Sequence, residues 1–191
     1  MYDFIAESYA VWAEKFRWYY KLFAMILKAY ANPSRILDVG TGPGIFIDEL
    51  KRVFPQAEVL GVDMSKNMCK SSRCLVADAK LLPFKDETFN LVTFVYSLHE
   101  IGTPAIYEAK RVLKRNGIIA IRDINPEIPK VLKHVLIEAL KNVNRDYSSY
   151  IAERINSFPT LKSVSTELGK NFEIKRIGCN IFDFDIIAKK I

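Results

Sequence analysis

Residues 37–44 read LDVGTGPG, and they place three glycines directly after the apolar run RILDV. The run predicts a buried strand and the residues after Gly44 predict a helix, so the glycines fall in the loop between them. A loop of this kind, at the carboxyl edge of a sheet, brings main-chain N–H groups and bare glycine surfaces against a ligand. The dinucleotide fingerprint GxGxxG requires glycine at position 45, where this chain has Ile45, so the motif disfavours a nicotinamide or flavin site.

Apolar runs that alternate with helical stretches predict an α/β fold with a parallel sheet and right-handed crossovers. Five runs, each bounded by turn residues, look like strands buried on both faces: residues 35–40, 57–63, 73–78, 89–96 and 117–124. Helices are expected at residues 44–54, 65–72 and 103–115. Asn116 and Gly117 are expected to end the last of these helices as a C-cap.

The C-terminal residues change this alternation. Residues 172–180 and 182–191 are two strand-like runs with almost nothing between them, and only an antiparallel pair can be joined so briefly. Two regions exceed the needs of the sheet: residues 1–31, with aromatic side chains at helical spacing, and the long crossover 125–171. The first is expected to form one or two helices. The crossover is expected to hold helices near residues 127–143, 147–156 and 160–168.

Composition favours one globular domain, because half of the 191 residues are apolar or aromatic. Charges interrupt the N-terminal segment, so it lacks the apolar stretch of a signal peptide or a membrane span. The three cysteines, Cys69, Cys74 and Cys179, are an odd number without CxxC spacing, which argues against a disulfide scaffold and against a zinc site. We therefore expect no metal, no membrane association and a cytoplasmic location.

The formal net charge is +6, and the basic excess belongs to the C-terminal half. Such a surface can attract an anionic substrate or a nucleic acid, but lysines scattered over solvated helix faces are the commoner cause. The cluster KRVLKR at residues 110–115 is explained by cations in the last turn of a helix, where the helix dipole favours them. Charge alone therefore selects no substrate.

Residues 35–124 carry a family resemblance, through LDVGTGPG, VLGVDMS, VADAKLLPFKDETFNLVTFVYSLHEI and AKRVLKRNGIIAIRDI. In order and spacing these segments resemble the class I S-adenosylmethionine-dependent methyltransferases of the small-molecule type, whose loop reads GxGxG. The resemblance implies a Rossmann-like α/β fold with helices on both faces of the sheet and a helical cap. It also implies seven mostly parallel strands in the order 3214576, with the last strand antiparallel and inserted beside the fifth.

A division of the chain follows from this resemblance. Residues 1–191 are expected to form a single methyltransferase domain. Its parts are an N-terminal helical flap (1–31), a cofactor-binding core (33–124), a crossover with cap helices (125–171) and a terminal hairpin (172–191).

The resemblance also implies roles for residues at the strand ends. Asp63 would accept hydrogen bonds from both ribose hydroxyls of S-adenosylmethionine, and Asp78 would accept one from the adenine amino group. The Ala79 N–H would meet an adenine ring nitrogen, and Met64 with Leu82 would enclose the adenine. As alternatives, the two aspartates could cap the turns that follow their strands, and the two apolar residues could belong to the core.

The remaining implied contacts involve the methionine part of the donor. Gly40 and Tyr96 would offer main-chain carbonyls to its amino group, and Asp38 would brace the loop. Tyr2 and Tyr9 resemble tyrosines of a helical flap over the cofactor, although an aromatic stripe is more often core. The expected cofactor-binding set is Asp38, Gly40, Gly42, Gly44, Asp63, Met64, Asp78, Ala79, Tyr96 and Tyr9.

Methyl transfer from a sulfonium requires alignment more than acid or base catalysis, so a base is needed only where the acceptor holds its proton tightly. The segment FVYSLHEI, residues 94–101, lies where the family places the reacting methyl group. His99 and Tyr96 are the catalytic candidates, with Glu100 nearby, although a histidine at a strand end is more often structural. The segment lacks the NPPY or DPPY tetrad of amino-methylating nucleic-acid enzymes, which disfavours that chemistry.

The sequence thus predicts an enzyme that methylates a small or medium-sized metabolite and releases S-adenosylhomocysteine. One alternative is an RNA methyltransferase that uses the basic C-terminal half, and another is a module that binds S-adenosylmethionine without catalysis. The expected partner is a small-molecule acceptor, with RNA as the second choice. The protein is expected to be a monomer or a homodimer.

Overall fold

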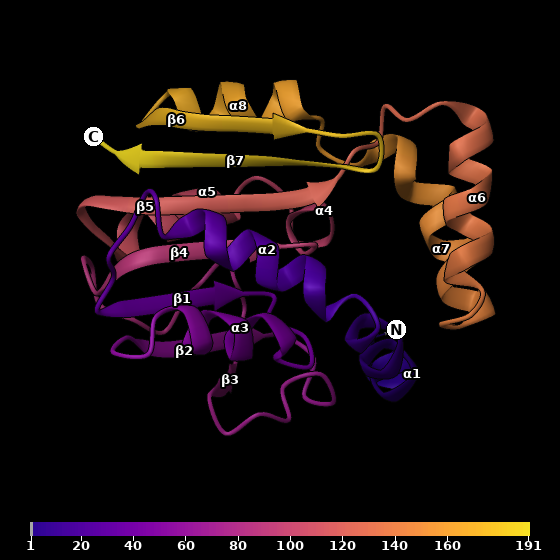
Figure 1. The fold of residues 1–191 in the computed structure, drawn as a ribbon, viewed down its shortest axis with the longest axis horizontal. Coiled ribbons are helices and arrows are strands. Elements are labelled where there is room, and N and C mark those ends of the chain that lie inside the picture. Colours follow the sequence, from indigo (N-terminus) through magenta and orange to yellow (C-terminus); the bar gives the residue numbers. More distant parts are fainter. Residues whose placement is uncertain (1) are drawn as a thin grey trace.

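Seven strands form one mixed sheet in the computed structural model, which describes residues 2–191 (Figure 1). They are β1 (Arg35–Val39), β2 (Glu58–Asp63), β3 (Cys74–Val76), β4 (Phe89–Val95), β5 (Leu113–Ile124), β6 (Phe172–Cys179) and β7 (Asp183–Lys190). Their order in the sheet is β3-β2-β1-β4-β5-β7-β6. The first five strands pair in parallel, and β7 runs antiparallel to both β5 and β6. The predicted fold class and strand order are therefore confirmed.

Helices cover both faces of this sheet because successive apolar residues of a strand point to opposite sides. In β1, Ile36 packs with α2 (Arg17–Leu27) and α3 (Ile45–Val53). Its neighbour Leu37 packs with α5 (Ala105–Val112) and α8 (Leu161–Gly169) on the other face. The result is two buried clusters separated by the sheet.

A third apolar cluster lies beyond the carboxyl ends of the parallel strands, where it forms the predicted helical cap. It joins α1 (Tyr2–Glu14), α6 (Lys130–Leu140) and α7 (Arg145–Arg154), which Figure 1 shows past the arrowheads of β1, β4 and β5. Two short elements complete the fold: α4 (Leu98–Ile101) and a 3₁₀ turn (Ile155–Ser157). None of the helices within residues 2–191 has the length and apolar character that a membrane crossing needs.

Three local predictions were wrong. Residues 65–72 form turns and bends instead of a helix. The helix expected at 103–115 ends at Val112, because Leu113 already pairs with Phe89 as the start of β5, so no C-cap forms at 116–117. Strand β3 is not buried on both faces: it is a three-residue edge strand with its side chains largely exposed.

Candidate functional site

The glycine loop after β1 has a left-handed backbone, with φ of +70° at Gly40, +54° at Gly42 and +86° at Gly44. A Cβ atom on Gly40 would collide with the Cβ of Ser97, so the close approach of the β4 end requires glycine there. A Cβ on Gly42 would instead meet nothing within 4 Å, although Gly42 lines the cavity described next. The main chain at Gly42 is thus accessible to a ligand in the cavity.

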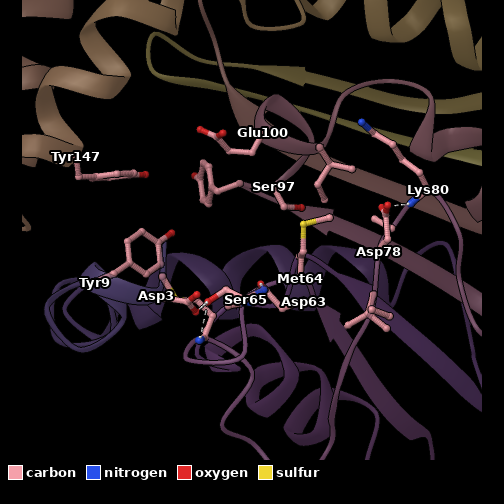
Figure 2. Close-up of a pocket in the computed structure, with 18 residues that line it drawn as sticks. Asp3, Tyr9, Asp63, Met64, Ser65, Asp78, Lys80, Ser97, Glu100 and Tyr147 are labelled. Atoms are coloured by element: carbon pink, nitrogen blue, oxygen red, sulfur yellow. Dashed lines mark hydrogen bonds between the residues drawn. The ribbon is translucent and has the colours of Figure 1, made fainter. Parts of the chain in front are cut away.

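This space is a cavity of about 410 Å³ at the carboxyl ends of β1, β2 and β4, within the size range of small-molecule sites (Figure 2). Eight of the ten residues predicted to bind the cofactor line it: Tyr9, Gly40, Gly42, Asp63, Met64, Asp78, Ala79 and Tyr96. The other two, Asp38 and Gly44, lie outside the lining, and Asp38 lines a small neighbouring cavity instead. The structure therefore brings most of the predicted set together, from strand ends and from the cap.

Asp63 ends β2 and is fixed against the glycine loop. Its Oδ2 accepts a hydrogen bond from the Gly42 N–H at 2.8 Å, and its Oδ1 accepts one from the Ser65 N–H at 2.9 Å. Burial raises the pKa of this carboxyl, and the two N–H donors oppose the rise. Each oxygen has lone-pair capacity left for a ligand hydroxyl.

Asp38 contacts the glycine loop from the end of β1 and does not line the cavity. It is buried and accepts hydrogen bonds from the hydroxyls of Thr41 and Thr93, both at 2.7 Å. Burial raises the pKa of Asp38 to about 7, against the lowering effect of the two hydroxyls. Asp38 is thus tied to the glycine loop through Thr41, which belongs to the loop itself; its predicted role as a brace stays a prediction.

The far end of the cavity is formed by the segment after β3. The Asp78 carboxylate accepts a hydrogen bond from the Lys80 N–H at 2.8 Å, and Ala79 is buried beside it. The Met64 side chain is 69% exposed and lines the cavity, so it is available to a ligand. Leu82 was expected to enclose the adenine with Met64, but it lies outside the lining because its side chain packs in the hydrophobic core.

The two catalytic candidates are arranged differently from each other. Tyr96 lines the cavity, but its hydroxyl donates a hydrogen bond to Asp183 at 2.9 Å, and Asp183 lies outside the lining. His99 is buried outside the lining, with its Nδ1 2.5 Å from the Asp123 carboxylate. Burial tends to lower the His99 pKa, but the charge of Asp123 and its hydrogen bond produce a net rise. Glu100, the next residue, does line the cavity.

An aromatic roof comes from the cap. Tyr9 of α1 and Tyr147 of α7 meet edge to face, with ring centroids 6.1 Å apart, on the side of the cavity away from Asp78 (Figure 2). Burial raises the pKa of Tyr9 to about 12. Sequence reasoning missed Tyr147, and it gave no role to Asp3, whose Oδ1 accepts hydrogen bonds from Ser65 and Asn67. The side chain of Tyr2 lies outside the part of the chain that the structure describes.

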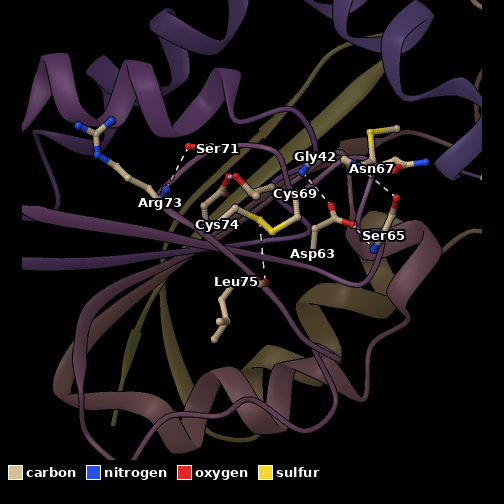
Figure 3. Close-up of a disulfide and its surroundings, with 12 residues drawn as sticks. Gly42, Asp63, Ser65, Asn67, Cys69, Ser71, Arg73, Cys74 and Leu75 are labelled. Carbon is tan, nitrogen blue, oxygen red and sulfur yellow. Dashed lines mark hydrogen bonds between the residues drawn. A yellow bond between two sulfur atoms is a disulfide. The ribbon is translucent and has the colours of Figure 1, made fainter.

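The cysteine count argued against a disulfide scaffold, but the structure contains one disulfide. Cys69 and Cys74 form one, with their Cα atoms 5.3 Å apart, and it closes the segment between β2 and β3 (Figure 3). An odd cysteine count requires only one unpaired thiol, and that is the exposed Cys179. Cys69 comes directly after Met68 and four residues after Ser65, and both of these residues line the cavity. No group of three metal-ligating side chains occurs among the described residues.

The basic cluster at 110–115 is largely tied to the protein. Arg111 contacts the carboxylates of Glu108 and Asp86, and Lys110 donates to Asn171. Only the first part of the cluster is helical, because Lys114 and Arg115 belong to β5. The explanation by the last helical turn therefore holds for Lys110 and Arg111 alone.

Comparisons with known proteins support a methyltransferase relationship. The family profile described as "Methyltransferase domain" matches residues 37–121. The demethylmenaquinone methyltransferase of Corynebacterium urealyticum is 30% identical over 158 residues, which cover 74% of this chain and 68% of that protein. The demethylmenaquinone methyltransferase of Thermotoga maritima is 30% identical over 141 residues, covering 66% of this chain and 61% of that protein. The chain spans about three fifths of the length of several curated relatives that it matches.

A solved structure supports the fold. The SAM-dependent methyltransferase of Thermotoga maritima described as a possible histamine N-methyltransferase matches with a TM-score of 0.73 at 21% identity. The match covers 100% of this chain and 98% of that chain. At this level of identity the likeness shows a common fold.

Proposed function

The chain belongs to the class I S-adenosylmethionine-dependent methyltransferases, and from this premise we propose that it transfers a methyl group from S-adenosylmethionine to a small or medium-sized, partly apolar acceptor. One observation carries the proposal: bare loop glycines and two strand-end carboxylates, Asp63 and Asp78, face the same cavity. An acceptor site without a donor site would not need this combination at the ends of adjacent strands.

The residues fit the donor by their chemistry. Gly42 leaves space for a ligand to approach the main chain, and Asp63 presents a fixed carboxylate that can accept bonds from two ribose hydroxyls. Asp78 and the Ala79 N–H offer an acceptor and a donor to the edge of an adenine, with Met64 against its face. Gly40 and Tyr96 would take the amino group of the methionine part through their carbonyls.

When bound, S-adenosylmethionine supplies a methyl group on a positively charged sulfur and leaves as S-adenosylhomocysteine. The protein has to orient this group and exclude water, which can supply much of the rate of an in-line transfer. Asp38 keeps the loop in place through Thr41, while Tyr9 and Tyr147 cover the cavity. These residues position the reactants and need not exchange protons with them.

The roof supports an acceptor with an apolar part, because aromatic rings bury apolar surface while their edges remain polar. Two of the curated relatives are named demethylmenaquinone methyltransferases, which supports a small-molecule acceptor. No feature of the site favours RNA over such a molecule, since Arg111 and Lys110 of the basic cluster have partners within the protein. The oligomeric state, monomer or homodimer, stays a prediction.

A labelling experiment tests the proposal. The purified protein is incubated with S-adenosylmethionine labelled in its methyl group and with either a bacterial metabolite extract or total RNA. We expect label in the metabolite fraction and none in RNA above a control without protein. Labelled RNA would favour the RNA methyltransferase, whereas donor binding without label in either fraction would favour the non-catalytic module.

A further inference from the structure

A chain of buried polar groups lies behind the cavity wall, where β4 and β5 end. Asp123 lies near the end of β5, His99 and Glu100 lie in α4, and Tyr150 and Arg154 extend toward them from α7. His99 and Asp123 are at least 94% buried. Polar side chains buried this deeply require partners, so the pairing of each atom indicates where protons are held.

Asp123 accepts a main-chain hydrogen bond on each of its two oxygens. Its Oδ2 accepts a hydrogen bond from the His99 N–H, and its Oδ1 accepts one from the Ile124 N–H, both at 2.8 Å. The His99 Nδ1 lies 2.5 Å from the same Oδ1. With a main-chain donor on each oxygen, this carboxyl group acts as an acceptor toward the ring, so the third contact places a proton on Nδ1 and aims the other ring nitrogen, Nε2, away from Asp123.

Nε2 of His99 and Oε1 of Glu100 face each other at 3.7 Å. Both atoms are buried, and neither has a hydrogen-bond partner among the described residues. Two unpaired acceptors facing each other away from water would each carry a desolvation cost. A proton on either atom turns the two facing acceptors into a donor and an acceptor; at 3.7 Å this is an electrostatic contact, which becomes a hydrogen bond only if the two side chains move closer. This pair is therefore built to hold one proton.

The other oxygen of Glu100 is held from α7. Oε2 accepts a hydrogen bond from the Tyr150 hydroxyl at 2.7 Å, and the Arg154 guanidinium lies 3.8 Å from the same oxygen. Arg154 also lies over the Tyr150 ring, 4.7 Å from its centroid. These contacts fix the carboxylate, yet Glu100 still lines the cavity with its side chain 15% exposed. Glu100, which Figure 2 shows among the residues that line the cavity, thus connects the buried polar groups with the ligand space.

We propose that Glu100 is the catalytic base that receives the proton of the methyl acceptor, and that His99 and Asp123 are its positioning residues. The inference rests on the proposed function. As the acceptor atom bonds to the methyl carbon, the carbon–sulfur bond breaks and its electron pair stays on sulfur. The proton of the acceptor moves to the Glu100 carboxylate and passes to water when the products leave. The site therefore takes an acceptor with a removable proton on oxygen, nitrogen or carbon.

The same groups set the pKa of His99, the residue that faces Glu100. His99 faces Asp123 from β5, Glu100 from its own helix and Arg154 from α7. Burial opposes a charge on His99, but the two carboxylates outweigh it and raise the His99 pKa, with Arg154 acting in the opposite direction. Removing the Glu100 charge should therefore lower the His99 pKa. Removing an equal charge from a residue outside this group of buried side chains should leave the His99 pKa unchanged.

The titration of His99 tests the shared proton without any substrate. Protein labelled with ¹⁵N-histidine is titrated by NMR, and the His134→Gln variant identifies the signals of His99, since the chain has only two histidines. We expect a His99 pKa above 6.5 in the native sequence and a lower value in Glu100→Gln. The exposed Glu153 of α7 provides the control, because Glu153→Gln makes the same charge change. An equal His99 titration in Glu100→Gln and Glu153→Gln overturns the inference.

The catalytic part is tested with the same variants. The probes are labelled S-adenosylmethionine and a bacterial metabolite extract, and label transfer is followed from pH 5 to 9 beside donor affinity. Glu100→Gln should lower transfer by about 100-fold, with a much smaller change in donor affinity. If Glu100→Gln and Glu153→Gln transfer label equally at every pH, this inference is overturned, while the proposed function still stands. If the native protein binds no donor, the proposed function falls and this inference falls with it, whatever the His99 titration shows.

Discussion

The cavity has two walls of different construction. The wall that we propose binds the donor, called the donor wall and defined by Gly42, Asp63 and Asp78, is made of main chain and short acidic side chains at strand ends. Main-chain N–H groups fix its carboxylates. The acceptor wall, defined by Tyr9, Glu100 and Tyr147, is made of side chains from three helices that are held by contacts between side chains. The first wall is rigid because the sheet fixes it. The second depends on how the cap packs, so it can change with the substrate while the first stays the same.

If the glycine loop fixes the donor wall, the largest effect should come from Gly40. Gly40→Ala combines a collision with Ser97 and a left-handed φ, so we expect the free energy of unfolding to fall by about 2–5 kcal/mol. Gly42→Ala is the matched variant: it has only the backbone cost, about 1–2 kcal/mol, but its methyl group enters the cavity and should weaken donor binding. Urea unfolding and calorimetry separate the two, and equal stability losses would contradict the assignment.

Asp63 should have the next largest effect. Asp63→Ala removes a carboxylate fixed by two N–H groups, so donor binding should weaken by about 1.5–3 kcal/mol, the range for hydrogen bonds to charged groups. Asp86→Ala is the control, because Asp86 is an exposed partner of Arg111 far from the lining. Calorimetry with S-adenosylmethionine gives both values. An unchanged affinity in Asp63→Ala would show that the ribose is bound elsewhere.

The disulfide should stabilise the segment between β2 and β3, which lies next to the donor wall. Cys74→Ser opens the short loop between β2 and β3, and we expect it to cost about 2 kcal/mol of stability by the chain-entropy estimate. Donor affinity should also fall, since Ser65 and Met68 next to this loop line the cavity. Cys179→Ser is the control, because that thiol is unpaired. A loss of stability without any change in donor affinity would show that the disulfide does not support the donor wall.

The buried Asp38 should have the smallest effect, expressed as the change in the free energy of unfolding per pH unit. Its pKa rises from 3.8 in the unfolded chain to about 7 in the folded one, so between these values the folded state binds more protons. Stability from this group is complete below pH 3.8 and is lost as the pH rises to about 7, at no more than about 1.4 kcal/mol per pH unit. Asp38→Asn should flatten that slope in urea unfolding measured from pH 4 to 8. An unchanged slope would mean that another group titrates.

The two walls also differ in how far the sequence predicts them. Asp63 and Asp78 are the last residues of two predicted strands, and Gly42 follows a third. The ends of parallel strands meet at one edge of a sheet, so sequence order placed Asp63 and Asp78 together. Tyr147 lies in the crossover, and no local pattern indicates that α7 returns over the cavity. His99 was predicted as a catalytic residue, but whether its side chain or that of Glu100 faces the cavity depends on the packing of α4 against β5. The disulfide was missed because a cysteine count carries no distances.

A structure of the protein crystallised with S-adenosylhomocysteine tests the central claim most directly. We expect both ribose hydroxyls within hydrogen-bond distance of the Asp63 carboxylate and the adenine between Met64 and the Asp78–Ala79 segment. The ligand bound outside this cavity, or a nicotinamide dinucleotide binding more tightly than S-adenosylmethionine, would contradict the account.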